Sequence, residues 1–240
     1  MELNICHLYP DLLNVYGDIG NILILKHRAE QRGISVSIKN ISINDDFIAD
    51  DYDIVFFGGG QDYEQSIVSK DLVNNKKEPI KKYIEDNKVF LSICGGYQLL
   101  GKTYETSTGE TLEGLGILDI YTKASTDRLI GNCIIYNESF NETYVGFENH
   151  SGKTYIGDLT PLGIVKHGYG NNGEDNKEGC IYKNTFCTYF HGSLLSKNPE
   201  LADRLLLLAL NNKYDEISIT ELDDSLEINA KNHIIERFVK

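Results

Sequence analysis

Apolar residues in the first hundred positions recur in short segments that are typical of strands, with helical patterns between them. The predicted strands lie at residues 3–9, 35–43, 53–60 and 89–94, and the last two are almost continuously apolar. Predicted helices follow at residues 21–32, 65–74 and 78–87. Strands that alternate with helices and are apolar on both faces are typical of a parallel, doubly wound α/β sheet.

The pattern changes after Gly101. Short β-like segments such as GILDIYT, CIIYN, YVGFENH and KTYIG are separated by Gly, Asn and Asp residues, and two further helices are predicted at 198–211 and 224–238. These segments indicate antiparallel strands added to the parallel core. Because no repeat or long linker interrupts the pattern, we expect one α/β domain over residues 1–240 with a mostly parallel sheet.

Composition narrows the possible partners and ligands. The formal net charge of −13 over 240 residues disfavours binding to phosphate backbones, so we expect no nucleic acid partner. No apolar run approaches the ~18 residues that a membrane-spanning helix requires, and the N-terminus does not resemble a signal peptide. We therefore expect a cytoplasmic protein without a transmembrane segment. The cysteines number five and form no CxxC pair, so neither a disulfide framework nor a metal site is expected.

A cysteine stands at the end of the predicted strand VFLSIC, where Gly95 and Gly96 follow Cys94 directly. Functional groups gather at the carboxyl ends of parallel strands, and a sharp strand-to-helix turn needs small neighbours, as in a nucleophile elbow. The helix that follows would direct its free amides at the sulfur and favour the thiolate. The pattern fits a nucleophile, and it also fits a buried cysteine that packs against two glycines.

A nucleophilic thiol needs a general base and donors for an oxyanion. The segment TFCTYFHG (185–192) predicts an apolar strand that ends at His191, whose imidazole could deprotonate a thiol and later protonate a leaving amine. The run Gly58–Gly60, after the strand DIVFF, offers unobstructed backbone N–H groups, together with the amide of Gly95. These residues predict acyl-transfer chemistry at one edge of the sheet.

Several motifs resemble those of class I (triad-type) glutamine amidotransferases. SICGGYQ (92–98) is similar to their C-x-G-x-Q elbow, FFGGGQD to their oxyanion loop, and YFHG to their histidine strand. The CGGYQ elbow is closest to the cobyric-acid-synthase-like branch. NVYGDIGN (14–21), TDRLIG (126–131) and GFENHSG (146–152) resemble the free-standing glutaminase subunits of lipid II isoglutaminyl synthases, and the likeness covers nearly the whole chain.

This resemblance implies a flavodoxin-like sandwich and a glutaminase that hydrolyses L-glutamine to glutamate and ammonia. It implies that Cys94 is the nucleophile and that His191 is the general base and then the general acid. It also implies oxyanion donors at Gly59, Gly60 and Gly95, and substrate-binding groups at Arg128 and Gln98. A guanidinium such as that of Arg128 suits a carboxylate through bidentate hydrogen bonds.

The resemblance further implies a partner, a Mur-ligase-like synthetase that would use ATP and Mg²⁺ to activate the α-carboxylate of D-glutamate in the peptidoglycan stem peptide. No cofactor is expected in this subunit, because GGGQD lacks the lysine of a phosphate-binding loop and no GxxxxGK[ST] motif occurs. Rival hypotheses are a glutaminase for another amidation, such as that of corrins, a cysteine acyl-hydrolase or peptidase with the same elbow, and a regulatory binding module.

One position departs from the class I pattern. Most members carry a glutamate two residues after the histidine, where this chain has Ser193. Either the site works as a Cys–His dyad or another carboxylate supplies the third member. Asp18 is a candidate because its loop follows the first strand, although a turn or helix-capping role fits Asp18 equally well. Glu148 is a second candidate carboxylate, and the neighbouring His150 could line the site.

Overall fold

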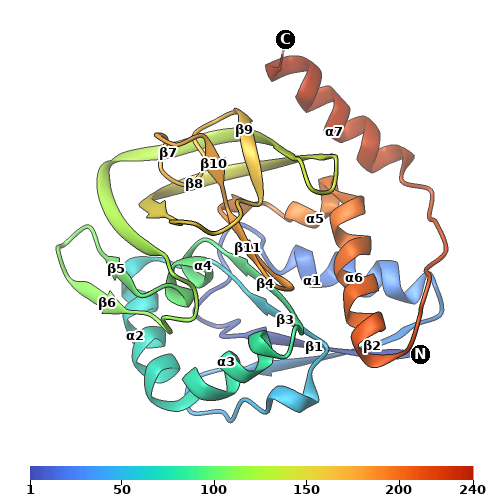
Figure 1. Cartoon of the computed structure of the whole chain (residues 1–240), viewed down its shortest axis with the longest axis horizontal. Helices are drawn as coiled ribbons and strands as arrows, with labels where there is room; N and C mark the ends of the chain where they lie inside the picture. Colours follow the sequence, from blue (N-terminus) through green and yellow to red (C-terminus); the bar gives the residue numbers. More distant parts are fainter. Residues whose placement is uncertain (240) are drawn as a thin grey trace.

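The computed structural model describes residues 1–239, and its central element is a parallel sheet with the strand order β11-β12-β4-β3-β1-β2 (Figure 1). Neighbouring strands of this sheet run parallel, except that β11 (Cys180–Tyr182) lies antiparallel at the edge. The parallel strands are β1 (Glu2–Leu8), β2 (Ser35–Ile41), β3 (Ile54–Phe57), β4 (Val89–Ile93) and β12 (Thr185–Thr188). The predicted α/β class and the predicted strands of the first half are confirmed.

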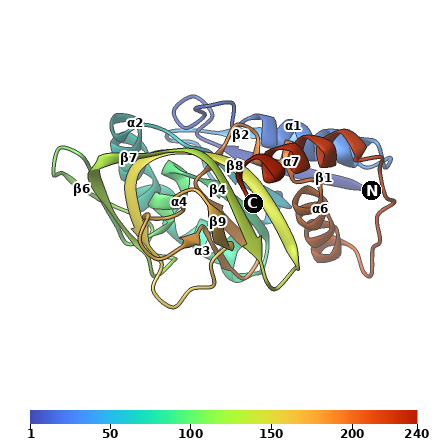
Figure 2. The ribbon, with the colours of Figure 1, turned by 90° about the horizontal axis from the view of Figure 1, so that it is seen from above.

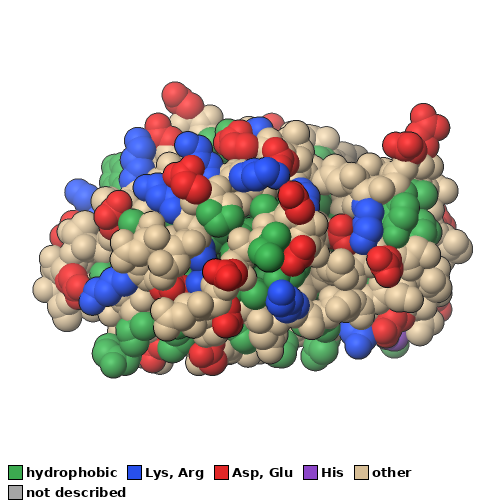
Figure 3. Space-filling view, turned by 90° about the horizontal axis from the view of Figure 1, so that it is seen from below, with side chains coloured by type: hydrophobic (Ala, Val, Ile, Leu, Met, Phe, Trp, Pro, Cys, Tyr) green, Lys and Arg blue, Asp and Glu red, His purple; other side chains and the backbone are tan. Residues whose placement is uncertain are grey.

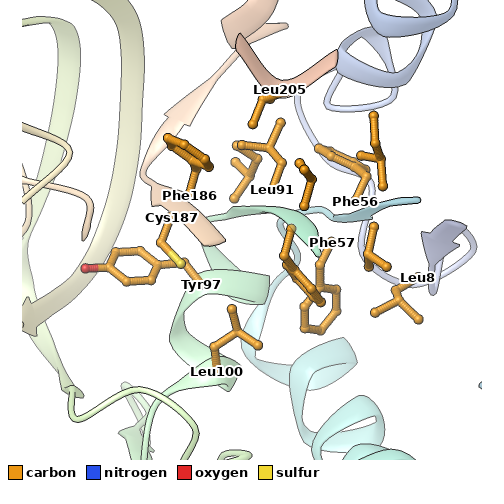
Figure 4. Packing of buried hydrophobic residues seen from close by; sticks show 14 of the residues in the cluster. Leu8, Phe56, Phe57, Leu91, Tyr97, Leu100, Phe186, Cys187 and Leu205 are labelled. Atoms are coloured by element: carbon orange, nitrogen blue, oxygen red, sulfur yellow. The ribbon is translucent and has the colours of Figure 1, made fainter. Parts of the chain in front are cut away.

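Helices cover both faces of the parallel sheet (Figures 1 and 2). On one face lie α1 (Gly20–Glu30) and α6 (Pro199–Lys213), and on the other lie α2 (Asp62–Asp71), α3 (Lys77–Glu85) and α4 (Gly95–Leu100). In Figure 4, Leu205 of α6 and Leu100 of α4 lie on opposite sides of the strands that carry Phe57 and Leu91. These side chains are buried, which explains why both strands are continuously apolar.

The two helices predicted between β3 and β4 are continuous. A π-helical turn, η2 (Leu72–Lys76), joins α2 to α3, and the buried ammonium of Lys76 pairs there with the carboxylate of Asp71. Before this segment, a short 3₁₀ turn, η1 (Ala49–Asp51), precedes β3. The helical stretch places the start of α2 beside the carboxyl edge of the sheet, because α2 begins shortly after β3 ends.

A second sheet contains the predicted antiparallel strands. Its main feature is a long hairpin of β7 (Tyr121–Asn137) and β8 (Glu142–Tyr155), which arches over one end of the molecule (Figure 1). The short segments that the sequence predicts here merge into two long strands, since the pairing extends along the hairpin with one irregularity, between Ala124 and Leu129. The remaining strands of this sheet are β5 (Thr103–Glu105), β6 (Thr111–Glu113), β9 (Gly163–His167), β10 (Lys177–Glu178) and β13 (Phe190–His191).

The segment predicted as one strand ending at His191 is divided between the two sheets, which corrects the sequence-based expectation. β12 pairs with β4 in the first sheet, whereas β13 pairs with β8 in the second. At the junction, Oε1 of the buried Glu178 carboxyl group accepts hydrogen bonds from the Thr188 hydroxyl at 2.7 Å and the Tyr189 amide at 2.8 Å. This change of sheet carries His191 across the carboxyl edge of the parallel strands.

The C-terminal region extends from the body of the fold. After the short α5 (Leu194–Lys197) and α6, the chain reaches α7 (Ser225–Phe238), which projects at one corner of the molecule (Figure 1). Ion pairs of Arg28 with Asp224 and of Lys231 with Glu200 attach this region. On the face in Figure 3, acidic, basic and apolar side chains are intermixed. Within residues 1–239, no helix combines the length and apolarity that crossing a membrane requires.

Candidate active site

Cys94 occupies a sharp turn between β4 and α4. Its backbone angles are φ 49° and ψ −105°, a conformation that non-glycine residues rarely adopt and that functional sites maintain through their surroundings. The Cys94 amide donates to the carbonyl of Thr188 at 2.8 Å, and the Gly96 amide donates to the carbonyl of Gly58 at 3.0 Å. These bonds tie the turn to both neighbouring strand ends. The structure therefore has the strained elbow that the sequence predicts.

Asp18 and His191 meet at the carboxyl edge of the parallel sheet, although 173 positions separate them in the chain. Nδ1 of His191 lies 3.0 Å from Oδ1 of Asp18, and both side chains are buried. A carboxylate can only accept, so this contact places the proton of the neutral imidazole on Nδ1 and leaves Nε2 with its lone pair. Nε2 is buried without a hydrogen-bond partner among residues 1–239 and is free to exchange a proton.

Gly59 lies where Cys94, His191 and Asp18 converge. A β-carbon at Gly59 would lie 2.7 Å from Cε1 of His191, 3.2 Å from Cβ of Cys94 and 3.3 Å from Oδ2 of Asp18. The first of these separations is too short for carbon atoms, so a larger residue would displace the imidazole. The glycine after β3 thus allows the thiol, the imidazole and the carboxylate to share one small volume.

The environment of His191 favours its protonated form. Burial disfavours the charged imidazole, but the negative charge of the Cys94 sulfur and the hydrogen bond to Asp18 outweigh burial and raise the pKa of His191 to about 10. An imidazole with a raised pKa is a better acceptor for the proton of a neighbouring thiol. In contrast, burial raises the pKa of the Cys6, Cys133 and Cys187 thiols, which keeps these cysteines protonated and unreactive at neutral pH.

The backbone amides of the glycines near Cys94 differ in whether they already donate a hydrogen bond. The Gly59 amide donates to Oδ2 of Asp18 at 2.9 Å, so in this arrangement it is not free to bind an oxyanion. The amides of Gly60 and Gly95 have no acceptor within residues 1–239, and a β-carbon at Gly95 would lie 3.0 Å from the Gly60 nitrogen. Two free donors therefore remain close together near Cys94, and Asp18 fixes the loop that carries one of them.

A cavity of about 580 Å³ opens beside Cys94 and has room for an amino acid. Arg128 and Gln98, for which the resemblance implies a substrate-binding role, both line this cavity. Nε of Arg128 donates to Oδ1 of Asn149 at 2.6 Å, and Nη2 donates to the hydroxyl of Tyr16 at 3.3 Å. The amide nitrogen of Gln98 donates to the Tyr189 hydroxyl at 3.0 Å, whereas its carbonyl oxygen is buried and has no hydrogen-bond partner in the described part of the chain.

The second candidate for the third acid, Glu148, makes no hydrogen bond to His191 within residues 1–239, although it lies on the strand that pairs with β13. The carboxylate of Glu148 accepts from the amides of Tyr169 and Gly170 at 2.7 and 2.8 Å and so binds the loop between β9 and β10. Ser193 adopts φ 59° and packs against Gly20. His150 lines the cavity and stacks on Tyr189, with ring centroids 3.5 Å apart.

Sequence reasoning did not identify Tyr16 or Asn149, the two partners of the Arg128 guanidinium. Both residues belong to motifs that were recognised, NVYGDIGN and GFENHSG. The motifs placed these segments near the site, but only the arrangement of the loop after β1 beside the β7–β8 hairpin shows which side chains reach Arg128.

Comparison with known proteins defines the class to which this fold and site belong. Residues 4–199 match the CobB/CobQ-like glutamine amidotransferase domain, so the chain belongs to this family. The fold agrees with this assignment, because a glutamine amidotransferase from Thermotoga maritima superimposes with a TM-score of 0.52 over 98% of this chain and 92% of that chain, at 13% identity.

Two relatives narrow the position within the family, and both are named lipid II isoglutaminyl synthase (glutamine-hydrolyzing) subunit GatD. The protein from Streptococcus pneumoniae is 51% identical over 228 residues, which cover 94% of this chain and 87% of the relative. The protein from Staphylococcus aureus is 49% identical over 236 residues, which cover 98% and 96%. The similarity therefore covers nearly the whole chain in both comparisons.

Proposed function

We propose that this protein is the glutamine-hydrolysing subunit of a lipid II isoglutaminyl synthase. The observation that carries the proposal is the convergence of Cys94, His191 and Asp18 around Gly59, beside the cavity that Cys94 lines, in a chain about half identical over nearly its full length to two proteins of that name. The substrate would be L-glutamine, and the products would be L-glutamate and ammonia.

In the first half of the reaction, Nε2 of His191 takes the proton of the Cys94 thiol, and the thiolate attacks the side-chain amide carbon of glutamine. As the C–S bond forms, the carbonyl electrons move to oxygen, and the free amides of Gly60 and Gly95 stabilise this oxyanion. His191 then gives its proton to the amide nitrogen. The C–N bond breaks, ammonia leaves, and a thioester to Cys94 remains.

In the second half, His191 takes a proton from water, and the water oxygen attacks the thioester carbon. The C–S bond breaks, glutamate is released, and the thiolate–imidazolium pair is restored. Asp18 holds the imidazole through Oδ1 and the Gly59 amide through Oδ2 in both halves of the reaction. Arg128 binds the α-carboxylate of glutamine, and the side-chain carbonyl of Gln98 accepts from its α-ammonium group; both residues line the cavity, which supports these roles.

The partner would be a Mur-ligase-like synthetase that holds ATP and Mg²⁺ and activates the α-carboxylate of D-glutamate in the stem peptide, in the cytoplasm. Ammonia in water at neutral pH is mostly ammonium, which is not nucleophilic. A glutaminase is therefore useful only when it delivers ammonia directly to its acceptor enzyme. The sequence has no phosphate-binding loop motif, which supports the assignment of ATP binding to the partner and of glutamine hydrolysis to this protein.

Two assays test the proposal. The first measures glutamate formed from glutamine, with and without the co-expressed synthetase, and the absence of hydrolysis under both conditions would refute it. The second uses the complex with Cys94→Ala, lipid II and ATP. High ammonium at alkaline pH should restore amidation, because ammonium bypasses the glutaminase step alone. Failure of this rescue in a complex that still assembles would refute the ammonia-donor role.

A further inference from the structure

Tyr16 stands over the proposed active site on the loop that follows β1. Its backbone lies in the left-handed region with φ 54°, next to Gly17 with φ 79°, and Asp18 follows two residues after Tyr16. The side chain is 52% exposed, yet it lines the same cavity as Cys94. A tyrosine in a strained conformation beside a reactive pair requires contacts that keep it there.

The two ends of the Tyr16 side chain contact two different functional groups. Its ring meets the imidazole of His191 edge to face, with centroids 4.9 Å apart and an interplanar angle of 68°. Its hydroxyl accepts the hydrogen bond from Nη2 of Arg128. One side chain therefore bridges the proposed general base and the proposed carboxylate-binding group.

These contacts have separable consequences. The ring covers the imidazole of His191, for which Asp18 is the only hydrogen-bond partner within residues 1–239, so the ring limits rotation of the imidazole away from Cys94. The hydroxyl orients one edge of the Arg128 guanidinium while Asn149 binds Nε. A guanidinium fixed at two positions is preorganised for a carboxylate and loses less freedom when the substrate binds.

We infer that Tyr16 is a positioning residue of the glutaminase site, whose ring holds His191 over Cys94 and whose hydroxyl prepares Arg128 for the substrate α-carboxylate. The inference rests on the proposed function. It adds the loop after β1 to the substrate-binding apparatus, in addition to the carboxylate of Asp18 on the same loop.

Kinetics of three variants separate the two contacts. Tyr16→Phe keeps the ring and removes the hydroxyl, so we expect the KM for glutamine to rise about 3–10-fold with little change in kcat. Tyr16→Leu removes the ring as well, so kcat should also fall about tenfold. Asn149→Ala loosens Arg128 from the other side and should raise KM alone. Ile19→Ala, an exposed apolar change on the same loop, serves as the matched control and should leave both constants unchanged.

A double mutant tests the coupling. In an Arg128→Ala background the Tyr16 hydroxyl has no donor, so adding Tyr16→Phe should change KM less than twofold, whereas additive effects would overturn the role of the hydroxyl. An unchanged kcat in folded Tyr16→Leu would overturn the role of the ring. If Tyr16→Leu does not fold, Tyr16→His keeps an aromatic ring and must retain a higher kcat than Tyr16→Ala for the inference to survive.

Alkylation of Cys94 by iodoacetamide gives a readout that does not require glutamine turnover. Removing the covering ring should change the alkylation rate of Cys94 several-fold in Tyr16→Leu, whereas Tyr16→Phe and Ile19→Ala should react like the parent. No glutamine hydrolysis by the parent, alone or with its partner, would refute the proposed function. In that case, equal alkylation rates for the parent and Tyr16→Leu would overturn the inference, and different rates would uphold the positioning of His191 and Cys94.

Discussion

Replacing Asp18 by asparagine would test the third member of the proposed triad. The carboxylate accepts two hydrogen bonds at once, from Nδ1–H of His191 and from the amide of Gly59. Asparagine has one acceptor and one donor group in the same volume. If its oxygen faces His191, its NH₂ opposes the Gly59 N–H. If its oxygen faces Gly59, its NH₂ drives the proton of His191 to Nε2, and the imidazole cannot accept the thiol proton.

The magnitude follows from the groups involved. A hydrogen bond to a charged group contributes about 1.5–3 kcal/mol, and a buried donor left unpaired costs about 1–3 kcal/mol. Since about 1.4 kcal/mol corresponds to a factor of ten in rate, the loss at both contacts amounts to a decrease in kcat of about 10²–10⁴-fold. The KM for glutamine should change little, because Asp18 does not line the substrate cavity.

The assay measures glutamate release in the complex, together with circular dichroism and a thermal melt to verify folding. Asp11→Asn is a matched control, because Asp11 lies on the same loop, is exposed, and accepts a hydrogen bond from the hydroxyl of Ser42, away from His191. Asp18→Asn activity within a few-fold of the parent, in a folded protein, would refute the reasoning and support a Cys94–His191 dyad.

Three further predictions concern other parts of the protein. Cys94→Ala should abolish glutamine hydrolysis without unfolding the protein. A glutamine-analogue electrophile should label Cys94 and spare the other cysteines. Peptide mapping that finds the label mainly on Cys133 or Cys187 would contradict the assignment of Cys94 as the nucleophile. Arg128→Ala should raise the KM for glutamine at least tenfold, which is about the effect of losing one hydrogen bond to a charged group. An unchanged rate at limiting glutamine would show that Arg128 does not bind the substrate. Burial raises the pKa of Glu178 from 4.5 to about 8. Between pH 4.5 and about pH 8, the folded state therefore binds more protons than the unfolded state, and the free energy of unfolding should fall as the pH rises through this range. In Glu178→Gln, this pH-dependent decrease in the free energy of unfolding should be smaller by up to a few kcal/mol, at about 1.4 kcal/mol per pKa unit. Urea titrations at pH 5 and pH 9 measure the decrease, and an equal decrease in both proteins would contradict the prediction.

The local pattern of the sequence determined the parallel core and the elbow. Continuous apolar runs before Gly58 and Cys94 indicate strands buried on both faces, because a sheet covered by helices leaves no polar face. The glycines after those strands indicate the close approach that the structure has at Gly59. Motif likeness then carried the family and the candidate residues Cys94, His191 and Arg128.

Tertiary structure alone decided how these residues combine. Asp18 and His191 are brought together because β1 and β12 end at the same edge of one sheet, and no local pattern encodes a contact between residues 173 positions apart. The division of the strand before His191 depends on Glu178, which binds the junction from another strand. The Gly59 amide is committed to Asp18, and Tyr16 reaches both His191 and Arg128, because the loop after β1 folds back over the cavity. Hydrophobic periodicity determines which segments are buried, but hydrogen-bond partners of buried polar groups depend on which loops the assembled sheets bring together.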